Sequence, residues 1–283
     1  MGVATTSGSA AGASAWWRVV RLRDGESAVG RLASFELHLH RLRSEWWVAH
    51  RSVAKTEAEP RIAAGAWRIG AGVDPPDAAN AQAITRHLFD ACPEEVLVRP
   101  GLADRDVIAR PRSLLSIAAR QRATVYAGTP VWVEVVAAGT RLLSVPVVRP
   151  TDTWFGPAPD AGELCYAVPT SARIGLDGTE ARSDLAITET QIENHTDDPL
   201  ELSFLRIPAP HLSLYAAPDG RLWTEAIRLE HEEAGEHAVQ EIVSGRPSAA
   251  AGAERLGEAR QPPPPRSAIR AFQRKALATF LGD

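Results

Sequence analysis

The stretch LSLYAAPDGRLW, residues 212–223, carries the clearest signal of fold class in this chain. Leu212 and Leu214 are separated by one residue, as they would be on the buried face of a β-strand. Ala-Pro-Asp-Gly follows and predicts a turn, because proline restricts the backbone and glycine accepts conformations that other residues avoid. Leu222 begins a second strand after the turn, so we predict a β-hairpin here.

Alternation of apolar and polar residues recurs on the N-terminal side of this hairpin. The stretches are FELHLH (residues 35–40), VWVEV (131–135) and LELSF (200–204). Glycine, proline and aspartate separate many short runs of this kind, and no long helical pattern is present that could connect parallel strands. We therefore predict an all-β or β-dominated fold, most simply an antiparallel β-sandwich.

Two segments have helical rather than strand-like spacing. A short internal helix is predicted over residues 80–90, where Ala83, Ile84, His87 and Leu88 would share one face. A C-terminal amphipathic helix is predicted to begin with Ser267 as its N-cap and to end at Leu281. Its apolar stripe would consist of Ile269, Phe272, Ala276 and Phe280.

Composition divides the chain into five predicted regions. Residues 1–15 are small and polar and are expected to be a disordered tail. An N-terminal β-rich region (16–110) and a β-sandwich region (111–243) follow, and the alternative is that they form one body. Residues 244–266 contain four consecutive prolines and are predicted to be a Pro/Ala-rich linker. The C-terminal helix occupies 267–283.

Bulk properties narrow the class of protein. The chain is 45% hydrophobic and 23% charged, as expected of a folded soluble protein, and its net charge of -4 disfavours nucleic acid as a partner. No apolar run reaches the about 20 residues of a membrane span, and no signal peptide is recognised. Cys92 and Cys165 have no CxxC partner. We expect a cytoplasmic protein that is not transmembrane, and arginine-rich, lysine-poor usage suggests a prokaryotic source.

The stretch PTDTWFGPAPDAGELCY, residues 150–166, concentrates aromatic and acidic side chains. Its candidate binding residues are Asp152, Trp154, Phe155, Glu163 and Tyr166. Aromatic rings beside carboxylates in a loop can line a pocket for a polar or cationic ligand, and paired carboxylates can act as acid and base. The alternative is that the aromatic rings anchor the loop to the body while the acids remain solvated.

The strand-like alternation at residues 35–40 also groups candidate metal ligands. On a strand, Glu36, His38 and His40 would point to the same face, and His38 and His40 are candidate ligands. Because the opposite face carries Phe35, Leu37 and Leu39, the simpler interpretation places the histidines on the solvent side. We predict no cofactor and no catalytic residue, since neither a phosphate-binding loop nor a G-x-S-x-G elbow is present.

These observations favour a non-enzymatic binding or scaffold protein that acts through its β surface and its tethered C-terminal helix. The helix of residues 267–281 would bind an unknown protein partner or an anionic membrane surface. The alternative function is a small-ligand-binding protein or hydrolase-like enzyme that uses the loop of residues 150–166.

One stretch resembles a known family. RPTDTWFGPAPDAGELCYAVPTSARI (149–174), with TPVWVEV (129–135) before it and LSLYAAPDGRLWTEAI (212–227) after it, is similar to domain of unknown function 432. This family consists of archaeal and bacterial proteins, and the resemblance is best over about residues 111–229. It implies a compact unit and a prokaryotic origin, and no activity or catalytic residue can be transferred from it.

Overall fold

The computed structural model describes residues 16–53, 67–77, 83–111, 113–156, 162–176, 182, 184–232, 237–264 and 267–270. The described chain is built from β-strands, and the one helical element in these ranges is the short 3-10 turn η2 (Ala209–His211). The β-dominated fold predicted from the sequence, with several antiparallel sheets, is confirmed. No helix in the described ranges is long and apolar enough to span a membrane.

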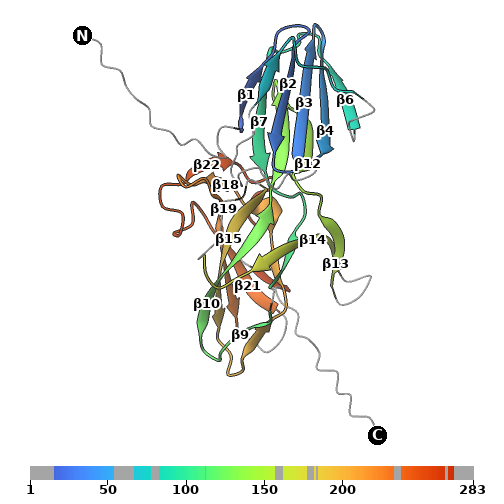
Figure 1. The fold of residues 1–283 in the computed structure, drawn as a ribbon. Helices are drawn as coiled ribbons and strands as arrows, with labels where there is room; N and C mark the ends of the chain where they lie inside the picture. The colour runs from blue at the N-terminus through green and yellow to red at the C-terminus, as the bar shows by residue number, and fades with distance from the viewer. Residues whose placement is uncertain are drawn as a thin grey trace, which may run out of the picture.

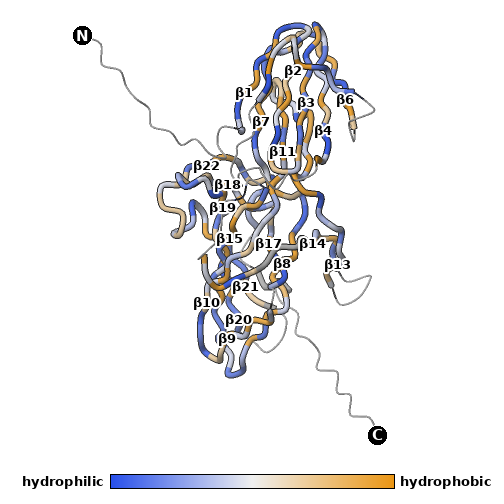
Figure 2. Tube along the Cα trace, viewed as in Figure 1, coloured by the Kyte–Doolittle hydropathy of each residue, from blue (hydrophilic) through white to orange (hydrophobic). Residues whose placement is uncertain are grey.

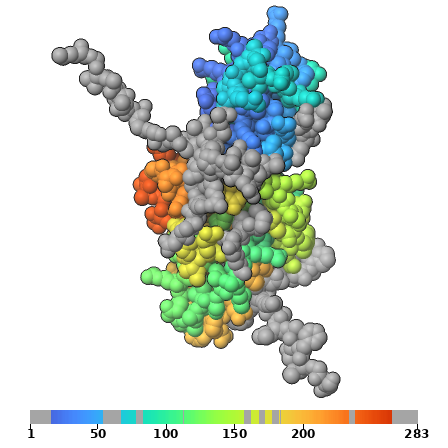
Figure 3. Space-filling model, in the orientation of Figure 1, coloured from blue at the N-terminus to red at the C-terminus, as the bar shows by residue number. Residues whose placement is uncertain are grey.

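The strands form two lobes that lie end to end along the long axis of the molecule (Figure 1). We call them the N-terminal lobe, which contains β1 to β7 with β11 and β12, and the C-terminal lobe, which contains the remaining strands. In the space-filling view the blue N-terminal strands occupy one end and the green, yellow and orange segments the other (Figure 3).

The first sheet of the N-terminal lobe has the order β5-β2-β3-β4-β6, and all its neighbours are antiparallel. Its strands are β2 (Ser27–Leu32), β3 (Phe35–Leu42), β4 (Glu45–Ser52), β5 (Arg68–Gly70) and β6 (Ala83–Leu88). Strand β3 contains the alternating stretch FELHLH, so its strand prediction is confirmed.

The second sheet of this lobe has the order β1-β7-β11-β12 and combines two distant parts of the chain. Its strands are β1 (Arg18–Arg21), β7 (Glu95–Gly101), β11 (Trp132–Ala137) and β12 (Thr140–Pro146). Strand β11 pairs with β7, so a hairpin from the predicted region 111–243 completes a sheet begun in the predicted region 16–110.

Side chains from both sheets of the N-terminal lobe belong to one hydrophobic core. Leu37 and Leu39 on β3 and Trp46 on β4 are completely buried, together with Val98 on β7 and Val133 on β11. Hydropathy alternates along these strands, as the orange and blue segments of Figure 2 show. The same core continues into the C-terminal lobe, where it includes Ile192 and Leu229.

The C-terminal lobe is dominated by an eight-stranded sheet of order β22-β18-β19-β15-β20-β21-β23, in which β10 also pairs with β15. Its strands are β10 (Arg122–Pro130), β15 (Leu185–Asn194), β18 (Leu214–Ala216), β19 (Leu222–Thr224), β20 (Ala226–His231), β21 (His237–Val243), β22 (Glu254–Gly257) and β23 (Ser267–Arg270). The predicted hairpin of residues 212–223 is confirmed as β18 and β19, with Gly220 at a positive φ of 83° in the turn.

Two smaller sheets complete the C-terminal lobe, with the orders β13-β14-β8-β17 and β16-β9. Their strands are β8 (Val107–Pro111), β9 (Leu115–Ile117), β13 (Thr151–Phe155), β14 (Glu163–Ala172), β16 (Leu200–Leu202) and β17 (Leu205–Ile207). Parallel neighbours also occur in this lobe, between β14 and β8 and between β15 and each of β19 and β20.

The predicted internal helix is wrong. Residues 83–88 form β6, an edge strand that pairs with Glu45–His50 along β4. Ile84 and His87 are only partly buried, and Leu88 is exposed, so β6 lacks the regular alternation that marks a strand in sequence. Pairing with the backbone of β4 therefore decides its structure, as tertiary context often overrides local spacing.

The predicted C-terminal helix is wrong where the structure describes it. Ser267–Arg270 forms β23, which pairs antiparallel with β21, while residues 271–283 and the predicted tail 1–15 lie outside the described ranges. Docking of a partner or membrane through a helix that begins at Ser267 therefore loses its structural basis.

The predicted linker contains β22, which pairs antiparallel with β18, so this part of it belongs to the eight-stranded sheet. Within it Ala250 and Ala253 are buried, because their small side chains pack with Tyr215 and Trp223.

Candidate functional site

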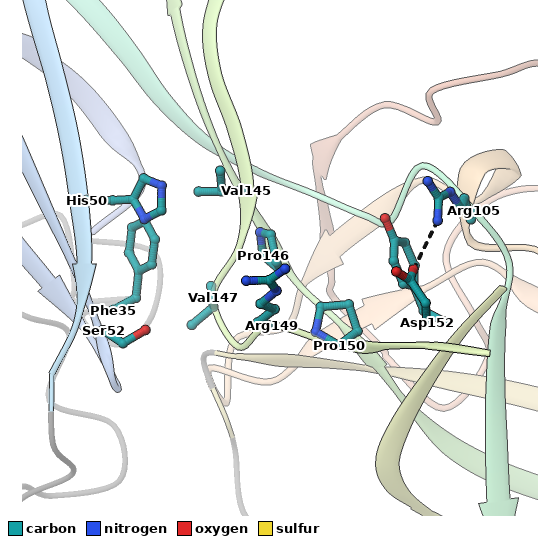
Figure 4. A pocket seen from close by; sticks show the side chains of 11 residues that line it. Phe35, His50, Ser52, Arg105, Val145, Pro146, Val147, Arg149, Pro150 and Asp152 are labelled. Carbon is teal, nitrogen blue, oxygen red and sulfur yellow. Dashed lines mark hydrogen bonds and ion pairs between the residues drawn. The ribbon is translucent and has the colours of Figure 1, made fainter. Parts of the chain in front are cut away.

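A pocket of about 360 Å³ lies where the two lobes meet (Figure 4). We call it the inter-lobe pocket. Three parts of the chain line it: strands β3 and β4, the end of β12 with the connection to β13, and the region of Arg105 with the β13–β14 hairpin. Ligand sites occur preferentially at such junctions, and this volume lies at the lower end of the usual range for small-molecule sites.

The wall from the N-terminal lobe consists of Phe35, His50 and Ser52. Pairing of β3 with β4 places Phe35 directly opposite Ser52, and the Phe35 and His50 rings stack with their centroids 5.6 Å apart. Burial lowers the pKa of His50, so its ring is neutral at pH 7 and can offer one donor and one acceptor.

The middle of the pocket is formed by the chain that leaves β12. Val145, Val147 and Pro150 supply apolar surface, and the Val147 amide donates to the Val131 carbonyl across 2.9 Å, which fixes this segment to the body. Arg149 lies between Val147 and Pro150 in Figure 4. Among the described residues, no carboxylate forms an ion pair with Arg149.

The wall from the C-terminal lobe combines a cation, an anion and an aromatic ring. Arg105 Nη1 lies 3.0 Å from Asp152 Oδ1, and its guanidinium lies 5.2 Å from the centre of the Tyr166 ring. The Tyr166 hydroxyl donates to Asp104 across 3.0 Å. Burial, together with this hydrogen bond, raises the pKa of Tyr166, so the phenol keeps its proton.

The predicted loop of residues 150–166 contains a β-hairpin, and its strand geometry separates the five predicted binding residues. Asp152 and Tyr166 are opposite each other across the hairpin and line the inter-lobe pocket. Trp154 is on the same face but is not part of the pocket lining, and it is 48% exposed.

Phe155 and Glu163 are on the other face of the hairpin. Phe155 packs edge-to-face on Phe204, with ring centroids 5.2 Å apart, while Glu163 pairs with Arg206 at 2.6 Å. The hairpin therefore brings two of the five candidates into the pocket and uses Phe155 for packing.

The weakly predicted metal ligands have other partners. His38 Nε2 lies 2.7 Å from Glu36 Oε1, and His40 Nδ1 lies 2.9 Å from Ser27 Oγ. Glu36 and His40 are buried, so the expectation that this face of β3 is open to solvent is wrong. Within the described ranges no three His, Cys, Asp or Glu side chains are grouped so that they could hold a metal.

Both cysteines are unpaired. Cys165 is buried beside Ile108, Phe155 and Phe204, and its burial, with the nearby carboxylate of Asp106, raises its pKa to about 11. A thiol with this pKa is protonated at neutral pH, which disfavours a role as a nucleophile.

Sequence reasoning missed Phe35, His50, Arg105 and Arg149 as pocket residues. They come from separate segments, and nothing in one sequence indicates that the end of β3 meets the connection after β12. One signal was present, since Arg149 directly precedes the aromatic-acidic stretch of residues 150–166. The unusually high arginine content of the whole chain obscured it.

A family model described as "Protein of unknown function (DUF432)" matches residues 16–279. The chain belongs to this family. The match covers nearly all of the chain and includes every residue of the inter-lobe pocket, so the pocket lies within the part that DUF432 defines. No curated protein and no solved structure matches the chain.

Proposed function

We propose that this DUF432 chain is a non-enzymatic binding protein that holds a small organic anion in the inter-lobe pocket. The observation that carries the proposal is Arg149, a cation in the pocket without an ion-pair partner among the described residues. Arg105 is paired with Asp152, and His50 is neutral at pH 7, so the lining has an excess of one positive charge.

The sign of this charge favours an anion over a cation. A carboxylate 4 Å from Arg149 would gain roughly 4 kcal/mol of Coulomb energy at an effective dielectric constant of about 20, and a cation would lose as much. Because Arg149 is exposed, salt weakens this attraction. Phe35, Val147 and Pro150 add apolar surface, which favours an organic anion over an inorganic one.

The polar groups of the pocket favour binding over catalysis. Asp152 is held in an ion pair with Arg105, and the Tyr166 hydroxyl donates a hydrogen bond to Asp104. A general acid and base must be free to reach the reacting atoms, and these two groups are already engaged with protein partners. A hydrolase-like activity of this hairpin is therefore the less favoured alternative.

We propose that each lobe is a β-sandwich and that regions 16–110 and 111–243 form one body, because β11 pairs with β7 and one core runs through both lobes. The net charge of -4 supports a protein that does not bind nucleic acid. A cytoplasmic site in a prokaryote is supported by composition and by the family resemblance.

Titration calorimetry with small carboxylates and phosphate esters at low salt tests this proposal. We expect Arg149→Gln to weaken binding by about 10- to 100-fold, the loss of one charge-assisted hydrogen bond. Arg18→Gln is the matched control, since Arg18 is an exposed arginine on β1 outside the pocket. Equal affinities for the two variants would show that the anion does not bind at Arg149.

A further inference from the structure

The β13–β14 hairpin carries a second pair of side chains next to the pair that lines the inter-lobe pocket. Asp152 and Tyr166 form one cross-strand pair and line the pocket, and Trp154 and Leu164 form the next pair on the same face. Residues two apart on a strand are separated by about 6.6 Å, so the Trp154–Leu164 pair begins one step beyond the pocket.

This second pair is apolar and unusually accessible. Trp154 is 48% exposed and Leu164 is 45% exposed. On the opposite face, Phe155 and Cys165 are buried in a small core with Ile108 and Phe204. The hairpin therefore packs into the body through one face and leaves apolar surface exposed on the face that carries Asp152 and Tyr166.

Gly162 holds the Trp154 ring close to the hairpin. A Cβ atom at position 162 would lie 2.6 Å from Trp154 Nε1 and 2.7 Å from Trp154 Cε2. Only glycine leaves room for the indole in this place, because real Cβ contacts are not this short. The absence of a side chain at position 162 therefore allows the indole to lie against the hairpin backbone.

We infer that the ligand is an amphiphilic carboxylate, with its charged group at Arg149 and an aromatic or aliphatic body that extends over Trp154 and Leu164. Arg105 lines the same pocket, where its ion pair with Asp152 and its contact with the Tyr166 ring hold it in place. This inference rests on the proposed function and specifies its ligand class. The position of the apolar pair, one step along the same hairpin face from a positively charged pocket, favours such a ligand over a purely polar anion.

Calorimetry with carboxylates of increasing apolar size tests the inference on the full chain. The probes are acetate, hexanoate and decanoate, with benzoate and 2-naphthoate as aromatic members. We expect affinity to rise by up to about fourfold for each buried methylene. Trp154→Ala and Leu164→Ser should remove most of this rise and leave acetate binding unchanged, whereas Arg149→Gln should weaken binding of every probe.

Leu88→Ser is the matched control for Leu164→Ser, because Leu88 is an exposed leucine on the distant edge strand β6. Gly162→Ala would press on the indole and also on the Phe155 carbonyl oxygen, which would lie 2.7 Å from the added Cβ atom, so it should disturb the hairpin and weaken binding of naphthoate more than that of acetate. Circular dichroism and gel filtration check that each variant is folded and keeps its oligomeric state.

The experiments distinguish failure of this inference from failure of the proposed function. If Arg149→Gln weakens every probe while Trp154→Ala and Leu164→Ser leave the dependence on size intact, the extended ligand is wrong and the anion pocket stands. If no carboxylate binds the unaltered protein, both the proposed anion binding and the amphiphilic ligand are wrong. A change of oligomeric state confined to the Trp154 and Leu164 variants would instead assign this surface to contact between protein chains and would overturn the inference.

Discussion

Gly30 shows how tightly single residues are packed in the N-terminal lobe. It lies on β2 beneath the Trp67 ring, and a Cβ atom there would lie 2.7 Å from Trp67 Cε2. Trp67 in turn stacks on Trp16 with ring centroids 5.4 Å apart and donates from Nε1 to the Trp16 carbonyl. One added methyl group would therefore press on a connected pair of indoles.

We predict that Gly30→Ala lowers the free energy of unfolding by about 1–3 kcal/mol, the usual cost of overpacking a core. Gly72→Ala is the control, because no heavy atom lies within 4 Å of a Cβ built at Gly72. Its effect should stay within about 0.5 kcal/mol. Urea unfolding measures both, and equal stabilities would show that Trp67 yields to the methyl group without cost.

His50, which lines the inter-lobe pocket, makes the stability of the protein depend on pH. Burial lowers its pKa in the folded state, so near pH 6 the unfolded chain binds more protons than the folded chain at this residue. Its contribution to stability is therefore complete above the unfolded pKa of about 6.5 and is lost as pH falls toward the lower folded pKa. Burial lowers the pKa of His87 as well, so this residue acts in the same direction.

We predict that the melting temperature of the protein falls between pH 7.5 and 5.0, and that His50→Gln reduces this fall. The contribution of one histidine cannot exceed about 1.4 kcal/mol per pH unit. His195→Gln, a change at a half-exposed histidine, serves as the comparison. A pH profile unchanged by His50→Gln would contradict a neutral ring at this half-buried position.

At the scale of elements, the alternation of apolar and polar residues was enough to predict those strands whose own sequence carries the pattern. Strand β3 and the β18–β19 hairpin were predicted because their apolar residues recur every second position and a Pro-Asp-Gly turn joins the hairpin. Strand β6 was mistaken for a helix because its structure comes from pairing with β4. The pocket could not be predicted, since Phe35, Arg105 and Arg149 meet only after the lobes assemble.

Strand β22 and the residues after it are joined to the N-terminal lobe by Arg260. Its Nε donates to the Leu102 carbonyl across 2.6 Å, and its Nη2 donates to Ser144 Oγ across 2.8 Å. The same nitrogen lies 3.0 Å from Glu134, a buried carboxylate that also pairs with Arg99. The segment that composition marks as a linker thus contacts the sheet that contains β7, β11 and β12.

We predict that Arg260→Gln lowers the free energy of unfolding by about 1.5–3 kcal/mol, the range for hydrogen bonds that involve a charged group. Arg255→Gln in the same segment should have a smaller effect, because Arg255 and its partner Glu258 are exposed. Limited proteolysis adds a second measurement, since cleavage within residues 244–264 should be faster in Arg260→Gln only. Equal cleavage of the two variants would argue against Arg260 as the attachment.

At the scale of the whole molecule, the chain passes between the lobes three times before it reaches β13. It leaves the N-terminal lobe after β7, returns for β11 and β12, and leaves again through residues 147–150. The first and last of these crossings supply Arg105 and Arg149 to the pocket. A ligand held there would contact both lobes, so binding should stabilise their arrangement relative to each other.

The pairing of β11 with β7 also affects the protein while it is being synthesised on the ribosome. Strand β7 is synthesised long before its neighbour β11, and the edge that β11 will cover has no partner until then. At about 5–20 residues per second, roughly 2–9 seconds separate the end of β7 from the end of β12. During this interval the nascent chain presents an open strand edge, a known route to aggregation that chaperones on the ribosome would have to shield.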